Sequence, residues 1–420
     1  MEITFFGFVW LIITLGIFLR QRTKEMITLL FVAMTFQQPA VIRVGNTGIG
    51  PQVITSCAYI IFYAKKNNWK IRIDRRNKAE RMSRRGCLFL ILCILSSFCF
   101  NGREVESEHW WIYFLQLCIY IICFLLMWGV RDVYSLHIIK EAFSTTIKVV
   151  SLIGVIQFLN TMRAVNITPI LQFLFYNNTD MGLRVGDRTY PWSMPRLYAT
   201  FQEPSYCSAF LVGAFFFLIA YSVKNKEDYF WIGLVLLELI LTFSSTAYGA
   251  FVLCGICYLI ISKNKKILRI LIPLAAICLC ILMASGSFMR IINDVILTKL
   301  DITKSGSAWE RNSWNEKALL FFKDSPILGI GYKNCRASYF IYSVLGQLGI
   351  CGLVSWVMIW IRSLFQALKN RSDEDTVAIS LFVLGVIIAM FVAIPDIDFC
   401  VFWLSMYLMA LYLKRYRISH

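Results

Sequence analysis

An arginine and a carboxylate stand just ahead of a long apolar run, in the segment Arg196-Leu-Tyr-Ala-Thr-Phe-Gln-Glu203-Pro204-Ser205. Pro204 suits the first turn of a helix, where its missing N–H is not needed, so Glu203 and Ser205 flank the start of the following helix. Charged groups at the end of a membrane helix are costly unless they are used. The segment indicates either a site for an anionic ligand or a structural Arg196–Glu203 pair that fixes the loop.

A second polar segment carries the helix-start pattern Ser307-Ala-Trp-Glu310, which has the Ser-x-x-Glu form of a capping box. Apolar residues follow at helical spacing until Pro326, namely Trp314, Ala318 and Phe321. This predicts an amphipathic helix with Arg311 in its first turns. Because helix N-termini attract anions, Arg311 would add charge where phosphate already binds well.

Beyond this helix, Pro326-Ile-Leu-Gly329-Ile-Gly331 predicts a flexible turn, and the cationic residues Lys333 and Arg336 follow it. The two glycines do not make a dinucleotide-binding loop, which needs a preceding strand. The nearby aromatic residues have two interpretations, either stacking on sugar faces or lying in the membrane interface: Trp309, Trp314 and Phe322.

The composition places these segments in a membrane protein. Hydrophobic residues make up 58% of the 420 positions and charged residues 16%, too few charges for a soluble surface. Apolar runs of roughly 17 or more residues recur throughout, and each is long enough to span a bilayer. We therefore predict an all-α polytopic protein with a single transmembrane domain over 1–420 and about 13 (12–14) spans. These are Ile3–Leu19, read as a retained span, and 26–42, 48–64, 86–100, 111–130, 145–160, 205–223, 229–243, 247–262, 267–285, 337–361, 377–394 and 399–413.

The orientation follows from the segment 65–85, which holds ten lysines and arginines against Asp74 and Glu80. Basic loops stay in the cytoplasm, so this loop is predicted to be cytoplasmic. Alternating outward from it puts the other short basic segments inside, with the N terminus out and the C terminus in. Two long loops, 161–204 and 286–336, are then predicted to be periplasmic.

Both outer loops carry cations on the side where the charge rule disfavours them. The first contains arginines and no lysine: Arg163, Arg184, Arg188 and Arg196. The second mixes both types: Arg290, Arg311 and Arg336 with Lys299, Lys304, Lys317, Lys323 and Lys333. Guanidinium groups donate a planar fork to adjacent oxygens, so a diphosphate at the outer membrane surface fits. Contacts with lipid phosphates or pairing with nearby carboxylates are the alternatives.

Other classes of site are disfavoured. The formal net charge of +17 is explained by topology and by attraction to anionic lipids, so no nucleic-acid partner is expected. The fourteen cysteines lie mostly in apolar spans without ligand spacing, and the histidines are scattered at His109, His137 and His420. We therefore expect neither a metal centre nor a cofactor.

Several short motifs resemble the family of Wzy-type O-antigen polymerases and WaaL-type O-antigen ligases. They are Arg196 with Phe201-Gln-Glu203-Pro204-Ser205, then Leu241-Thr-Phe-Ser244-Ser245, Arg311-x-x-Trp314, Pro326-Ile-Leu-Gly329-Ile-Gly331 and Leu348-Gly-Ile-Cys-Gly352. The resemblance covers roughly residues 167–360 and implies a helical bundle similar to GT-C glycosyltransferases. It also implies metal-independent glycan transfer in the bacterial inner membrane, on the periplasmic face, from an undecaprenyl-diphosphate-linked oligosaccharide. A chain-length regulator protein is a candidate partner, beside the membrane lipids.

The resemblance also implies roles for particular residues. Arg196 and Arg311 correspond to the arginines that hold the donor diphosphate, and Glu203 to an acidic position typical of polymerase-like members. Glu203 would take a proton from the acceptor hydroxyl, if a base is needed at all. Substrate-binding candidates around them are Arg184, Arg188, Arg290, Lys333, Arg336 and Trp314.

Two departures bear on the choice within the family. Ligases usually carry a histidine after the Gly-x-Gly turn, and Lys333 to Gly352 contains none, which favours a polymerase. The turn Ser244-Ser245-Thr246 lacks an arginine that many members have, so its hydroxyls are expected to satisfy a helix turn. An O-antigen ligase remains the competing enzyme. A lipid-linked oligosaccharide flippase is the competing class, although few ionisable residues other than Glu238, Asp396 and Asp398 lie in or near the spans.

Overall fold

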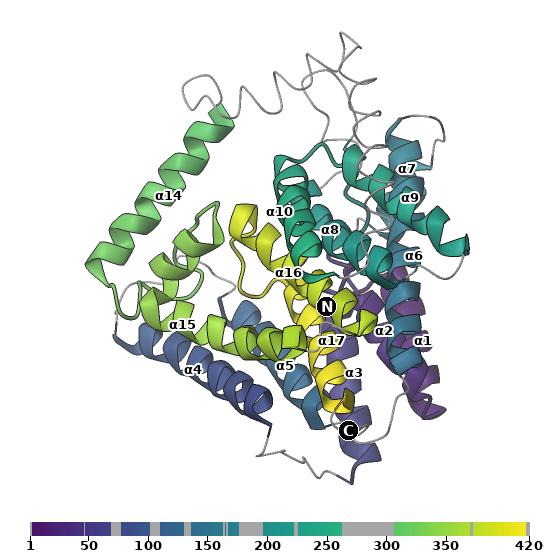
Figure 1. Ribbon diagram of the computed structural model, residues 1–420, viewed down its shortest axis with the longest axis horizontal. Coiled ribbons are helices and arrows are strands. Elements are labelled where there is room, and N and C mark those ends of the chain that lie inside the picture. The colour runs from purple at the N-terminus through teal and green to yellow at the C-terminus, as the bar shows by residue number, and fades with distance from the viewer. Residues whose placement is uncertain are drawn as a thin grey trace.

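The computed structural model describes residues 2–45, 47–68, 77–100, 110–129, 136–162, 164, 167–175, 196–221, 226–262, 306–369 and 373–416. Over these ranges the chain is nearly all helical, which confirms the helical class predicted from the apolar runs (Figure 1). The N-terminal helices are α1 (Phe5–Leu19), α2 (Thr23–Ala33), α3 (Pro51–Lys66), α4 (Lys78–Phe100), α5 (Trp110–Gly129), α6 (Leu136–Thr161) and α7 (Thr168–Leu174). The later ones are α8 (Pro204–Tyr221), α9 (Lys226–Leu241), α10 (Ser245–Ile261), α14 (Gly306–Asp324), α15 (Phe340–Lys369), α16 (Glu374–Ala393) and α17 (Cys400–Tyr416).

Six helices in the described part of the chain are long and apolar enough to cross a membrane, namely α4, α5, α6, α8, α15 and α16. Shorter apolar helices accompany them, in α1, α9, α10 and α17. These lengths and compositions make the chain a multi-pass membrane protein. The full count of spans stays a prediction, and the predicted span 267–285 lies outside the described residues.

The predicted span over 26–42 is wrong in its second half. Helix α2 ends at Ala33, because Pro39 cannot continue a helix and disfavours helical backbone at the residue before it. The chain then forms β2 (Ile42–Val44), which pairs antiparallel with β1 (Glu2–Ile3) and with β3 (Thr47–Ile49). The all-α prediction is corrected by this small sheet, in which Ile42 lies opposite both Ile3 and Ile49.

The basic segment 65–85 is partly helical. Lys65 and Lys66 end α3, and α4 begins at Lys78, before the predicted start of its span. The buried Glu80 explains this early start, because Arg84 one turn later donates to its carboxylate at 2.7 Å and neutralises it.

The centre of the bundle is packed through small residues. An added Cβ on Gly385 of α16 would lie 2.9 Å from the Cα atom of Gly213 of α8, so the two backbones touch. Small residues at such contacts let membrane helices approach closely. Figure 1 shows α8, α10 and α16 gathered on one side, with α14 reaching away from α15 and α4 on the other.

The segment after α14 is held tightly, in contrast to the predicted flexible turn. Helix α15 is broken at Gly349, which has φ +63°, and the chain around Gly329 packs into the break. A Cβ on Gly329 would lie 2.3 Å from the carbonyl carbon of Gln347, and one on Gly349 would lie 2.3 Å from the carbonyl oxygen of Ile327. Only glycine allows this approach, because both positions also need a positive φ.

Candidate active site

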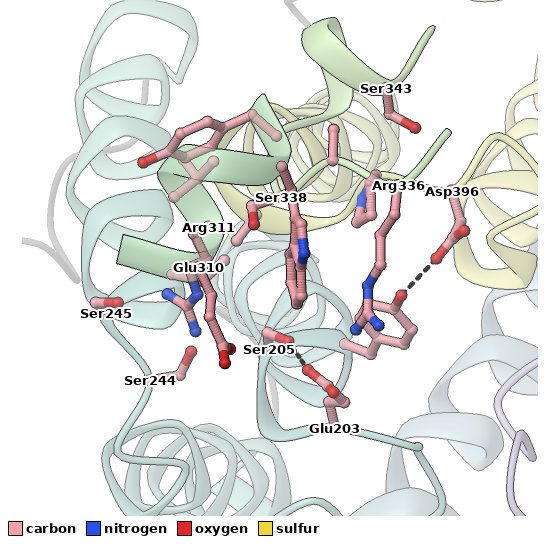
Figure 2. Close-up of a pocket in the computed structure, with 18 of the residues that line it drawn as sticks. Glu203, Ser205, Ser244, Ser245, Glu310, Arg311, Arg336, Ser338, Ser343 and Asp396 are labelled. Carbon is pink, nitrogen blue, oxygen red and sulfur yellow. Dashed lines mark hydrogen bonds between the residues drawn. The ribbon is translucent and has the colours of Figure 1, made fainter. Parts of the chain in front are cut away.

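A cavity of about 680 Å³ lies where α8, α10, α14 and α15 meet the end of α16. The structure brings to its wall every candidate residue that it describes: Arg196, Glu203, Arg311, Trp314, Lys333 and Arg336. Figure 2 shows the guanidinium of Arg311 toward Ser244 and that of Arg336 on the side of Glu203, with Ser205 between the two arginines. The candidates Arg184, Arg188 and Arg290 lie outside the described residues.

Helix N-termini converge on the cavity. Its lining includes Pro204 and Ser205 in the first turn of α8, Ser245 in the first turn of α10, and Tyr339 just before α15. The first N–H groups of a helix have no partner within the helix and carry the positive end of its dipole. Together with the arginines, these ends make the cavity wall suited to a ligand with several negative oxygens.

Ser244 has a role that the sequence analysis missed. It is the N-cap residue of α10, yet within the described part of the chain its side chain makes no capping hydrogen bond, and it lines the cavity instead. The expected use of this turn's hydroxyls to satisfy the helix start is therefore not met at Ser244. A hydroxyl and backbone N–H groups at a helix N-terminus are a usual arrangement for binding phosphate.

Arg196 is fixed by the end of α9. Its Nε–H donates to the carbonyl oxygen of Thr242 at 3.0 Å, and the backbone N–H of Leu197 donates to the carbonyl oxygen of Leu241 at 2.9 Å. These bonds orient the guanidinium plane toward the C-terminus of α9, where the helix dipole is negative. Arg196 therefore reaches the cavity from a rigid backbone segment.

Helix α14 brings Glu310, Arg311 and Trp314 to the cavity. The predicted start at Ser307 needs a correction, because the described helix already includes Gly306, so Ser307 is not the N-cap. Asn315 holds α14 in place, since its Oδ1 accepts from the backbone N–H of Ser338 at 2.9 Å.

The aromatic residues of α14 have different surroundings. Trp314 lines the cavity, and the guanidinium carbon of Arg336 lies 4.1 Å from the centroid of its ring system. This cation–π contact orders Arg336 at the wall. Trp309 is 64% exposed.

Lys333 lies between two carboxylates. Its Nζ donates to Asp396 at 2.9 Å and to Asp398 at 2.8 Å, and the hydroxyl of Tyr206 donates to the other oxygen of Asp396. Burial favours a lower pKa for Lys333, but the two carboxylates outweigh burial and raise the pKa well above its usual value. Lys333 thus stays charged, but much of its charge is already compensated.

The pKa values of the two aspartates are shifted in opposite directions. Burial favours a higher pKa for both, but at Asp396 the charge of Lys333 and the hydrogen bond from Tyr206 outweigh burial and hold the pKa below its usual value. At Asp398, which is only 7% exposed, burial prevails and raises the pKa. Asp396 is therefore the ionised carboxylate that faces the cavity.

Glu203 is a second carboxylate at the wall. It directly precedes α8, and the hydroxyl of Ser205 donates to its Oε2 at 3.3 Å. Figure 2 shows this contact and, separately, the one between Tyr206 and Asp396. The cavity thus combines guanidinium groups and helix N-termini with carboxylates that can accept a proton.

Tyr206 and Asp396 are not among the site residues predicted from the sequence. The sequence signal was present in Ala393-Ile-Pro395-Asp396, where a proline and a carboxylate follow an apolar helix much as Glu203 and Pro204 precede one. Among the described residues, no group of three or more metal-ligating side chains comes together, and we assign no metal-binding residues.

Comparison with known proteins gives one family. Residues 229–346 match the family model described as O-antigen ligase, and no curated protein matches the chain significantly. The matched segment runs from α9 into α15 and contains Ser244, Arg311 and Lys333 of the cavity wall. Over this part of its length the chain is similar to the O-antigen ligase family.

Proposed function

We propose that this protein is an O-antigen polymerase. It would transfer a growing glycan from undecaprenyl diphosphate to a sugar hydroxyl of another lipid-linked repeat unit, on the periplasmic face of the inner membrane. The observation that carries the proposal is the meeting of Arg196, Arg311 and Arg336 with the N-termini of α8 and α10 around one cavity. Such a wall suits a diphosphate.

The reaction exchanges one bond to the anomeric carbon for another. The acceptor oxygen attacks this carbon, the bond from the carbon to the phosphate oxygen breaks, and both of its electrons leave with the diphosphate. Negative charge therefore grows on the leaving group in the transition state. Cations and N–H groups already fixed toward it, those of Arg196 and Arg311 foremost, would lower the barrier because they bind this state more tightly than the substrate.

The acceptor hydroxyl loses a proton in the same step. Glu203 is our candidate base, since it lines the cavity beside Ser205 and lies on the segment that carries Arg196. Asp396 is less suited, because it already accepts hydrogen bonds from Lys333 and Tyr206 and its pKa is lowered. A carboxylate with a low pKa is a weak base.

The helix directions support a site at one face of the membrane. Helices α8, α10 and α15 begin at the cavity, whereas α16 ends there and α9 ends at the neighbouring Thr242. The basic ends of α3, at Lys65 and Lys66, belong to the opposite face in the predicted orientation. The positive-inside rule then favours a periplasmic cavity.

Within the family, a polymerase is favoured over a ligase by the sequence after the Gly329-Ile-Gly331 turn. Ligases usually carry a histidine there, and Lys333 to Gly352 contains none. A flippase would place ionisable groups near the middle of the membrane. Glu238 is a buried ionisable group within α9, but it lies one turn from the end of that helix, and the cations and carboxylates of the cavity wall lie at or near helix ends.

The first test is a lipopolysaccharide gel of a deletion strain. Loss of a polymerase leaves lipid A core bearing a single repeat unit. Core alone, with polymer still on its lipid carrier, would instead identify a ligase, and repeat units retained in the cytoplasm would identify a flippase. Either of these two outcomes would overturn the proposal.

The second test replaces Arg196 by lysine, which keeps the charge and loses the planar fork. If Arg196 binds the diphosphate in the transition state, transfer should slow on the order of 10²-fold at normal protein level. The matched control is Arg362→Lys, an exposed position in the second half of α15, which should leave the rate unchanged. Normal polymer length in Arg196→Lys would return Arg196 to a structural role.

A further inference from the structure

The backbone from Arg196 to Gln202 is surrounded by buried amide side chains. Gln157 of α6 is fully buried, and Gln37 and Gln38, which follow α2, are 5% and 1% exposed. A buried glutamine costs free energy unless both its N–H groups and its oxygen find partners. The hydrogen bonds of these residues therefore show what they are used for.

Gln157 uses its amide group on the segment that carries Arg196. Its Oε1 accepts from the backbone N–H of Tyr198 at 3.1 Å and of Ala199 at 3.4 Å. Its Nε2 donates to the carbonyl oxygen of Arg196 at 3.3 Å and to the hydroxyl of Thr161 at 3.0 Å. Both lone pairs and both N–H groups of the amide are thus engaged.

The opposite side of the segment is held by residues that follow α2. The backbone N–H groups of Gln37 and Gln38 both donate to the carbonyl oxygen of Thr200, at 3.0 and 3.1 Å. The side chain of Gln38 donates to the carbonyl oxygen of Phe201 at 2.8 Å. These bonds fix the far end of the segment and leave the placement of Arg196 itself to Gln157 and α9.

The backbone at Ala199 needs this support. Its φ is +47°, a left-handed conformation that costs free energy in a residue other than glycine. Gly154, one turn before Gln157, allows the close approach, because a Cβ there would lie 3.4 Å from the Cβ of Ala199. A leucine or methionine could fill the volume of Gln157, but neither could bond the two N–H groups that the Ala199 turn presents.

We propose that Gln157 is a positioning residue for Arg196. It holds the backbone that directly follows the Arg196 side chain, from the carbonyl group of Arg196 to the N–H of Ala199, so that the guanidinium reaches the cavity where the donor diphosphate binds. This inference rests on the proposed function, because it assigns Gln157 to the same transfer reaction. Gln157 acts through Arg196 and touches no substrate.

The test is a double-mutant cycle of Gln157→Met and Arg196→Ala, with the transfer rate measured on purified protein in vesicles over a range of donor concentrations up to saturation. Gln157→Met should lower the rate about tenfold to a hundredfold with little change in the KM for the donor, because a misplaced cation stabilises the transition state less well. In the Arg196→Ala background, Gln157→Met should have little further effect. Arg311 lies on α14, away from the segment that Gln157 holds. In the Arg311→Ala background, Gln157→Met should therefore lower the rate by the same factor as in the wild-type protein.

A second variant distinguishes this specific coupling from a general loss of stability. Asn160 is the matched control: it is a buried amide of the same helix, and it bonds Ile167 and Thr168 instead of the Arg196 segment. Asn160→Leu should lower the melting temperature without the specific coupling to Arg196→Ala. Gln157→Glu, which keeps the acceptor oxygen for Tyr198 and Ala199, should recover part of the rate.

The outcomes separate the two proposals. If Arg196→Ala leaves transfer unchanged, the proposed function fails. The other case is that Arg196→Ala removes most of the transfer, and Gln157→Met then lowers the remaining rate by the same factor as it does in the Arg311→Ala background. In that case the proposed function stands and the role of Gln157 is refuted.

Discussion

Lys333 and Arg336 are three residues apart on the same turn, but their charges have different uses. Lys333 is bound by Asp396 and Asp398, whereas Arg336 lies against the face of Trp314. An aromatic ring orients a guanidinium without neutralising it. The positive charge that this turn offers to an anion therefore comes mainly from Arg336, and Lys333 serves mainly to join the turn to the segment that follows α16.

Replacing Lys333 by methionine should destabilise the fold more than it affects the cavity wall. The change leaves Asp396 and Asp398 near each other without their shared cation, at a cost of roughly 2–4 kcal/mol, the low end applying because Asp396 is partly exposed. The measurement is the Tm of the purified protein. Adding Asp398→Asn to Lys333→Met removes one of the two unpaired carboxylates and should restore part of the Tm. A double variant no more stable than the single one would contradict this account.

At the scale of helices, the break in α15 is what brings the turn after α14 into the site. The backbone N–H groups of Ile330 and Gly331 donate to the carbonyl oxygens of Gly346 and Gln347, which the break leaves accessible. The turn that carries Lys333 is thereby bonded to the first half of α15. The second half of α15 packs against α4 (Figure 1).

Gly349→Ala should therefore disturb both halves of α15. An alanine at this position would have to keep the positive φ of Gly349, and its Cβ would clash with the carbonyl of Ile327. We therefore expect the free energy of unfolding to fall by more than about 2 kcal/mol, seen as a lower Tm and less protein in the membrane. The matched control is Gly249→Ala in α10, where a Cβ would meet nothing within 4 Å among the described residues. Alanine there should be neutral or stabilising by up to about 1 kcal/mol. Equal Tm changes in the two variants would rule this explanation out.

Sequence patterns predicted much of this architecture because apolar length and charge bias act locally. They indicated the long helices, and they selected Arg196, Glu203 and Arg311, which the structure places at one cavity. They could not show that the hydroxyl of Tyr206 bonds Asp396, because these residues are 190 positions apart and their pairing depends on how α8 packs against α16. They also failed at 34–42, where hydropathy suggests the second half of a span but Pro39 and backbone pairing favour a turn and the start of a strand.

At the scale of the whole molecule, the predicted orientation can be tested independently of activity. Alkaline phosphatase, which is active only outside the cytoplasm, should be active when fused within 176–195 and inactive when fused within 69–76. Green fluorescent protein fused after residue 420 should fluoresce, because the C terminus is predicted to be cytoplasmic. The reverse pattern would put the cavity on the cytoplasmic side and exclude the proposed periplasmic reaction.

The position of α17 has a consequence for how the protein is made. From Cys400 to Leu413 every side chain is buried, and α17 packs against α5, α16, α15 and α6 (Figure 1). This helix is nevertheless the last of the described helices to leave the ribosome. The earlier helices must therefore enter the membrane before their central partner exists, and they must leave room for it.

Asp396 and Asp398, directly before α17, reach Lys333 only when that helix has docked. Completion of the cavity wall is in this way coupled to the final step of assembly, and a stalled nascent chain would lack it.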